Sequence, residues 1–210
     1  KTHDKRIDLL NKYKINYVAW GKNKFSKNFS WVDLDNKAAI EKITNYLIKK
    51  GHKDISYINI SEKYNFASER KASFLKTLKK NKIRFNKDYY ASVKLEEPEK
   101  SFEIIRKMLS KNKKITSIIC STEFSALSAI KACNYLNLEI GKDISIITFD
   151  GPLVKDLSSP PITAISFPVQ ELGKRAIKIL LKGHLNKKNY SNFEAKSDII
   201  DRGSVHQVRG

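Results

Sequence analysis

The chain has 210 residues, and its 41 Lys and Arg against 22 Asp and Glu give a formal net charge of +19 at pH 7. That length accommodates one large domain or two small ones with a substantial core. Two cysteines, Cys120 and Cys133, exclude a disulfide-stapled scaffold, so we expect reduced, buried thiols and a cytoplasmic location. No apolar stretch approaches the ~20 residues of a spanning helix, so no membrane partner is expected.

The excess of lysine is spread along the chain, as in KTLKKNK, SKNKK and HLNKKN. These lysines fall on the polar faces of predicted helices and in loops, and no basic stripe is interleaved with aromatic residues. The pattern therefore favours solvated faces over a dedicated nucleic-acid footprint.

Short apolar runs alternate with amphipathic stretches along the whole chain. Strands are predicted at residues 15–20, 55–60, 89–95, 115–120 and 144–149. Helices are predicted from the cap candidates Asp35 and Asn36 to Gly51, around 74–78, 102–109 and 126–133, and at 169–182. This order of strands and helices predicts an α/β fold with a parallel sheet and right-handed crossovers.

An aspartate follows the last of these buried strands, in ITFDG at residues 147–151. Open α/β sheets bind ligands in the crevice outside the carboxyl ends of their strands, which makes Asp150 a ligand candidate. An ordinary turn or helix-capping acid is the alternative, and the pattern alone leaves both open.

The sequence carries little that indicates catalysis. It contains no Gly-rich phosphate loop, no nucleophile elbow and no zinc-ligand spacing, and its histidines are far apart. We therefore expect no catalytic residues, no metal, no cofactor and no enzymatic activity.

Five stretches, in the correct order, resemble motifs of the lac repressor/galactose repressor family. ISIITFDGPLVKDLSSPPITAISFPVQELGKRAIKILL resembles its Phe-Asp turn, Pro-Pro-Leu-Thr-Thr crossover and final helix opening with Glu-Leu-Gly. The other four are SWVDLDNKAAIEKITNYLIKKGHKDISYI, SERKASFLKTL, CSTEFSALSAIKA and SDIIDRGS. The resemblance covers essentially the whole chain.

The resemblance implies a fold of periplasmic-binding-protein-like type I, with two parallel-sheet subdomains and a ligand cleft between them. On that layout the N-terminal subdomain holds residues 1–59 and 166–186, and the C-terminal subdomain holds 60–165 and 187–210. The hinge regions then fall near Ile60, at 164–167 and at 185–189. The family's helix-turn-helix head and the first part of its sensor domain have no counterpart here, so an incomplete N-terminal subdomain is expected.

The same resemblance implies the ligand-binding residues. Asp150 matches the family's aspartate that accepts hydrogen bonds from ligand hydroxyls, and Arg70 matches its helix arginine, whose guanidinium fork suits vicinal hydroxyls or a carboxylate. Asp35 matches an acid on the opposite wall, and Thr122 stands at the usual asparagine, although either can be a helix cap. Candidate aromatic platforms for a sugar ring are Phe66, Tyr64 and Trp31, and core packing is the alternative for Phe66 and Trp31.

The implied function is the effector-sensing and dimerisation domain of a transcriptional repressor. The resemblance implies that a small molecule binds in the cleft, with a sugar favoured and a purine as the alternative, and that operator DNA is contacted only through the absent head of a homodimer. The alternative from another class is a transported-solute binding protein of the same fold.

Overall fold

The computed structural model describes residues 5–22, 29–94, 96–156, 158–185 and 190–208. The helices are α1 (Lys5–Lys12), α2 (Asn36–Lys49), α3 (Asn65–Lys80), α4 (Pro98–Lys111), α5 (Glu123–Tyr135), α6 (Pro152–Lys155) and α7 (Val169–Leu185), with a 3-10 turn η1 (Lys87–Tyr89). The strands are β1 (Val18–Trp20), β2 (Ser30–Leu34), β3 (Ile55–Ile60), β4 (Tyr90–Val93), β5 (Ser117–Cys120), β6 (Ser145–Phe149), β7 (Thr163–Ile165), β8 (Asn192–Ala195) and β9 (Ile199–Ile200).

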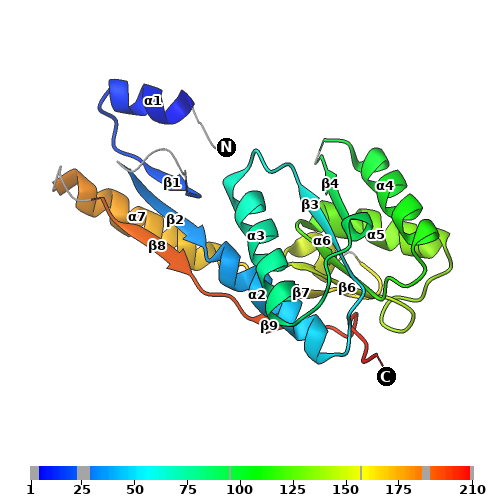
Figure 1. Ribbon diagram of the computed structural model, residues 1–210. Coiled ribbons are helices and arrows are strands. Elements are labelled where there is room, and N and C mark those ends of the chain that lie inside the picture. Colours follow the sequence, from blue (N-terminus) through cyan, green and yellow to red (C-terminus); the bar gives the residue numbers. More distant parts are fainter. Residues whose placement is uncertain (1–4, 23–28, 95, 157, 186–189, 209–210) are drawn as a thin grey trace.

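Within the described residues, a six-stranded sheet in the order β4-β3-β5-β6-β7-β9 forms the larger subdomain. Its strands are parallel except β9, which runs antiparallel to β7. One core cluster joins the sheet to α2 and α3, and the other joins it to α4 and α5 on the opposite face (Figure 1). Because both faces are covered, β3, β5 and β6 are buried along their whole length, which explains why apolar residues do not alternate strictly with polar ones along them.

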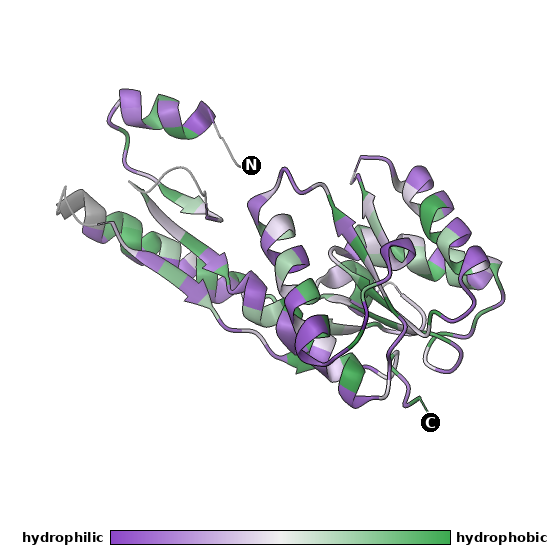
Figure 2. Cartoon of the chain, in the orientation of Figure 1, coloured by the Kyte–Doolittle hydropathy of each residue, from purple (hydrophilic) through white to green (hydrophobic). Residues whose placement is uncertain are grey.

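A parallel three-stranded sheet, β1-β2-β8, forms the smaller subdomain. Val32 and Ala195 pack with Leu172 of α7 in its core. The helix α1 precedes this sheet, and none of its residues is buried. Figure 2 shows apolar residues along α7, where Ile177 and Leu181 are largely exposed.

Helix α2 shows how local sequence builds the larger subdomain. The Asp35 side chain accepts a hydrogen bond from the Ala38 amide at 3.0 Å and caps the helix. Ile40, Ile43 and Leu47 are fully buried on one face, and each contributes about 1.5–3 kcal/mol of transfer free energy. The helix ends shortly before Gly51. This residue has a φ of +89°, and a side chain there would collide with the Val208 carbonyl, so both features favour glycine. The helix start and end predicted from the sequence are therefore confirmed.

Along the described ranges, the chain passes between the two sheets three times. It crosses at Asp35 between β2 and α2, at 166–168 between β7 and α7, and at 196–198 between β8 and β9. These crossovers bond to one another: the Asp35 amide donates to the Ala195 carbonyl at 3.0 Å, and the Ser166 amide donates to the Asp198 carbonyl at 2.8 Å. The Lys42 ammonium lies 2.6 Å from an Asp198 carboxylate oxygen. The hinge is thus a compact, hydrogen-bonded region.

Two of the expected boundaries are wrong. Residues 36–59 were assigned to the N-terminal subdomain, but β3 pairs with β4 and β5 in the larger sheet, and α2 packs in the same core. Residues 187–210 were assigned to the C-terminal subdomain, but β8 pairs with β2 in the smaller sheet. The first crossover therefore lies at Asp35 instead of Ile60, and the third follows β8 instead of preceding it.

The two cysteines are free and fully buried, which confirms that expectation. Burial raises the pKa of both thiols, that of Cys133 to about 12. In the described part of the chain, no helix is long and apolar enough to cross a membrane.

Candidate functional site

A cavity of about 560 Å³ lies between the two subdomains, and we call it the cleft cavity. Helix α1, β1 and β2 of the smaller subdomain contribute one wall, including Arg6, Trp20 and Asp33. The other wall comes from the beginning of α3, directly after the carboxyl end of β3. This is the place where open α/β sheets bind ligands.

Arg70 of α3 is the most buried charged group of the cavity, with 5% of its surface exposed. Its Nε donates to Asn36 Oδ1 at 2.8 Å, and its Nη1 donates to the Ser121 carbonyl at 2.9 Å. The guanidinium carbon lies 3.4 Å from the centre of the Phe149 ring and 4.8 Å from that of Phe66. Desolvation lowers the Arg70 pKa to about 10, so the side chain stays charged at neutral pH.

Asp33 orients this arginine through Asn36. The Asn36 amide donates to Asp33 Oδ1 at 3.2 Å and to the Leu34 carbonyl at 3.0 Å, which leaves its own Oδ1 for Arg70. The other Asp33 oxygen accepts a hydrogen bond from the Lys22 amide at 3.2 Å. Neither Asp33 nor Asn36 was predicted as a site residue. The signal available for Asp33 was an acid between the apolar residues Val32 and Leu34, inside a strand that the pattern did not predict, whereas Asp150 directly follows a predicted strand.

Aromatic rings line the cavity from both subdomains. Tyr64 and Phe66 lie with ring centres 5.9 Å apart on the α3 side. Trp20, 51% exposed, faces the cavity from β1, and its ring centre is 6.3 Å from that of Phe167. The predicted platform Trp31 does not line the cavity, and the Lys22 ammonium lies 5.3 Å from its ring centre. Trp20 therefore lines the cavity as the aromatic residue that the sequence analysis predicted at Trp31.

Asn65 is a further polar lining residue that sequence reasoning missed. It is 5% exposed, and its Oδ1 is buried without a hydrogen-bond partner in the described structure. It is the first residue of α3, whose N-cap residue Tyr64 makes no side-chain capping hydrogen bond. No sequence signal distinguished Asn65, because its isolation depends on what surrounds it in space.

The remaining predicted residues have partners elsewhere. The Asp150 carboxylate accepts a hydrogen bond from Arg202 Nη2 at 2.6 Å, and it does not line the cleft cavity. Asp35 and Thr122 both cap helices, Asp35 that of α2 and Thr122 that of α5 in a capping box with Ser125. Of the predicted ligand residues, the structure brings Arg70, Phe66 and Tyr64 together in one cavity.

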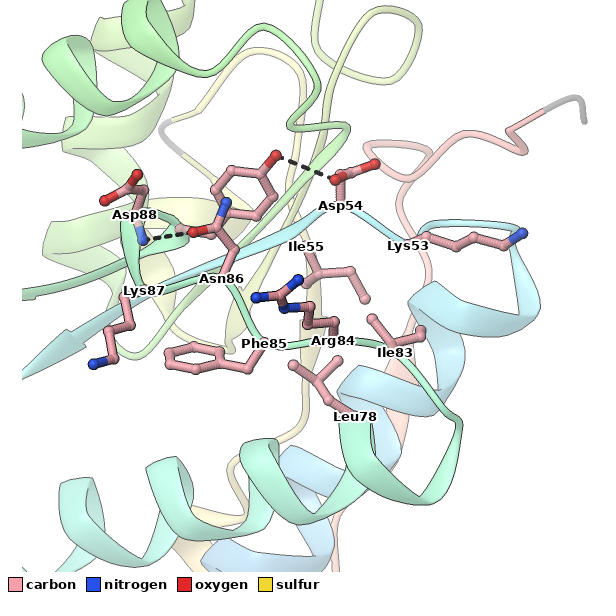
Figure 3. A pocket seen from close by; sticks show the side chains of 11 residues that line it. Lys53, Asp54, Ile55, Leu78, Ile83, Arg84, Phe85, Asn86, Lys87 and Asp88 are labelled. Atoms are coloured by element: carbon pink, nitrogen blue, oxygen red, sulfur yellow. Dashed lines mark hydrogen bonds between the residues drawn. The ribbon is translucent and has the colours of Figure 1, made fainter.

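A second hollow of about 600 Å³ lies at the amino end of β3, bounded by the end of α3 and by η1 (Figure 3). Its buried lining residues are Ile55, Leu78 and Tyr89, and the Tyr89 hydroxyl already donates to Asp54 at 3.2 Å. The Lys53 and Lys87 side chains point away from each other on its two sides (Figure 3). This hollow therefore lacks the convergent, buried polar groups of the cleft cavity. In the described ranges, no three His, Cys, Asp or Glu residues are placed to hold a metal ion.

Residues 44–205 match the family model described as the periplasmic binding protein-like domain. The chain belongs to this family. It is 28% identical over 207 residues to the HTH-type transcriptional regulator RegA of Clostridium saccharobutylicum, covering 96% of this chain and 61% of that protein. It is 31% identical over 187 residues to the HTH-type transcriptional repressor PurR of Histophilus somni strain 2336, covering 89% of this chain and 55% of that protein. The chain thus spans little more than half the length of these relatives.

Solved structures agree on the fold. A regulatory protein of the LacI family from Chloroflexus aggregans superposes with a TM-score of 0.84 at 26% identity, covering 96% of this chain and 73% of that one. A LacI family regulator from Enterococcus faecium with bound ribose superposes with a TM-score of 0.87 at 18% identity, covering 99% and 78%. The resemblance to a sensor domain of the lac repressor/galactose repressor family, and its α/β fold with parallel sheets, are confirmed.

Proposed function

We propose that this chain is the effector-sensing domain of a transcriptional repressor and binds a small molecule, a sugar, in the cleft cavity. The observation that carries the proposal is the buried Arg70 guanidinium, held by Asn36 and Phe149 in a cavity lined by both subdomains. A fixed guanidinium beside aromatic faces suits a ring that has hydroxyl groups on its edge and apolar faces above and below.

Sensing follows from the position of the cavity between two subdomains. A ligand that touches β1 on one wall and α3 on the other favours the inter-subdomain angle at which both sets of contacts are made. We place this change at the crossovers that contain Asp35, Ser166 and Asp198, because there the chain passes between the two sheets. Such coupling is typically ~1–3 kcal/mol, which is enough to shift an equilibrium between two angles.

The relatives named as transcriptional regulators support a role in regulation and not in catalysis. We propose that the complete protein is a cytoplasmic homodimer that contacts operator DNA through a head outside this chain. Two buried, free cysteines favour the cytoplasm over an oxidising compartment.

Calorimetric titration of a panel of sugars and purine bases against wild type and Trp20→Ala tests the proposal. Trp20 is half exposed, so its truncation should spare the fold but weaken the tightest-binding sugar by about 10-fold. Tyr13→Ala is the matched control, because Tyr13 is exposed in the same subdomain and does not line the cavity. Equal effects of the two changes, or binding of no sugar, would contradict the proposal.

Small-angle scattering on the same samples gives the second readout. Saturation with the bound sugar should reduce the radius of gyration as the subdomains close around it. An unchanged radius of gyration would contradict the proposed coupling between ligand binding and the inter-subdomain angle. It would not contradict ligand binding itself.

A further inference from the structure

Charged side chains of the two subdomains meet beside the cleft cavity. Lys22, which lines the cavity from the smaller subdomain, places its ammonium 3.9 Å from Oε2 of Glu69 on α3 of the larger subdomain. The Lys37 ammonium of α2 lies 4.0 Å from the other carboxylate oxygen of Glu69. The pair Lys22–Glu69 thus joins the two subdomains at a place away from the crossovers.

The Glu69 carboxylate is not satisfied by these two neighbours. Its side chain is 11% exposed, and within the described structure its Oε2 has no hydrogen-bond partner. The separation of 3.9 Å between Lys22 Nζ and Oε2 is about 1 Å longer than a charge-assisted hydrogen bond. Because a carboxylate removed from water normally accepts hydrogen bonds, Glu69 favours a movement that brings an ammonium closer.

Lys22 is held from its own side of the cleft. Its ammonium contacts the Glu194 carboxylate of β8 and lies 5.3 Å from the centre of the Trp31 ring of β2. Its backbone amide donates to Asp33 at 3.2 Å. These contacts all lie within the smaller subdomain, so the separation between Lys22 and Glu69 depends on how the two subdomains are placed. Trp31, which does not line the cavity, positions the ammonium instead.

We infer that Lys22 and Glu69 form a closure latch between the subdomains, with Trp31 as its positioning residue. When the cleft closes, the ammonium moves about 1 Å nearer and donates to Glu69 Oε2, a hydrogen bond that the arrangement in this structure lacks. The latch therefore increases the closed population even in the absence of a ligand. Its effect on ligand affinity rests on the proposed function, because a ligand that needs the closed arrangement binds more tightly when that arrangement is more populated.

Spin-label distances in the ligand-free protein test the latch directly. One label is attached to Ile177→Cys on α7 and the other to Lys107→Cys on α4, because both positions are exposed and the native cysteines are buried. Glu69→Gln keeps the shape of the side chain and removes its charge. Glu41→Gln is the matched control, because Glu41 of α2 forms its ion pair with Lys80 inside the larger subdomain.

Glu69→Gln should lower the ratio of closed to open molecules about 3- to 10-fold, and Glu41→Gln should leave it unchanged. Raising the salt concentration from about 50 to about 500 mM should lower the ratio in wild type and have less effect in Glu69→Gln, because salt screens the ion pair. Identical distance distributions in wild type and Glu69→Gln would overturn the latch, and so would an equal shift in Glu41→Gln. If Glu69→Gln does not fold, Lys22→Gln replaces it with the same expected shift.

Calorimetry with the tightest-binding sugar of the panel separates this inference from the proposed function. Glu69 does not line the cleft cavity, so Glu69→Gln should weaken that sugar about 2- to 5-fold through the closed population alone. Equal affinity in wild type and Glu69→Gln would contradict the latch and leave the proposed function standing. If no sugar binds the wild type, the proposed function fails while the label distances still decide the latch.

Trp31→Leu tests the positioning residue. This change should weaken the same sugar, but it should add nothing further in the Glu69→Gln background, because the ammonium then has no carboxylate to reach. A merely structural role of Trp31 predicts additive losses in the double variant, and that result would remove Trp31 from the latch.

Discussion

The two ends of the six-stranded sheet hold different groups of buried polar side chains. At the amino end, His52 Nδ1 lies 2.9 Å from Thr116 Oγ1, and Ser145 Oγ lies 3.0 Å from His52 Nε2 and 2.9 Å from His206 Nδ1. At the carboxyl end, within the described residues, the Arg70 guanidinium donates hydrogen bonds to the neutral acceptors Asn36 and Ser121, and Asn65 Oδ1 has no hydrogen-bond partner. Groups that satisfy one another stabilise a fold, whereas a charged group that lines a cavity, such as Arg70, is available to a ligand.

The topology accounts for this difference. In a parallel sheet each crossover helix begins near the carboxyl end of the strand before it, so helix N-termini and the side chains of their first turns gather there. The amino end receives helix C-termini and returning loops. The second hollow lies at that end, where Tyr89 and Asp54 already bond to each other.

The variants Asp150→Ala and Asp54→Ala each remove one carboxylate. Asp150 lies at the carboxyl end of the six-stranded sheet, and Asp54 lies at its amino end. Asp150 pairs with Arg202, and their side chains are 23% and 13% exposed. Its removal leaves a mostly buried guanidinium unpaired and should lower the free energy of unfolding by about 2–3 kcal/mol. Asp54 accepts only from the Tyr89 hydroxyl among the described contacts, so its removal should cost about 1 kcal/mol.

Urea unfolding of both variants measures these differences. The resemblance to the family implies a ligand-binding role for Asp150, whereas the Arg202 contact gives Asp150 a structural role. An unchanged unfolding free energy with an affinity loss above 10-fold would restore the ligand role and place Asp150 with Arg70.

Acid should weaken the amino end of the sheet. Burial, and then the neighbouring His206, lower the His52 pKa from 6.5 to about 4, so the folded state favours the neutral imidazole. The stability this provides is fully present above pH 6.5 and is lost as the pH falls towards 4, because the unfolded chain binds the proton first. Unfolding free energies at pH 7.5 and 5 should therefore differ less in His52→Gln than in wild type. If the unfolding free energy depends equally on pH in both proteins, protonation of His52 does not cause the acid destabilisation.

Features that depend on neighbouring residues were predictable from the sequence. The cap at Asp35, the end of α2 at Gly51 and the fully buried strands each follow from a few adjacent side chains. The resemblance to a known family added Arg70, which the structure places in the cleft cavity. These inferences need no knowledge of which strands pair.

Features that depend on distant pairing were not predictable in the same way. Nothing in ISYINI states that β3 pairs with β4 and β5, and NFEA of β8 is too short and polar to identify its sheet. Asp150 and Arg202 are 52 residues apart, so the partner of the aspartate could not be read from its surroundings. The isolation of Asn65 is likewise a property of the packed cavity.

Hydrogen exchange with and without the tightest-binding sugar of the calorimetric panel tests the central claim that the effector occupies the carboxyl end of the sheet. Slower exchange is predicted at residues 18–22 and 61–70, which bound the cleft cavity, with no change at 81–89 around the second hollow. Protection confined to 81–89, with exchange at 61–70 unaffected, would contradict the account and move the ligand to the opposite end of the sheet.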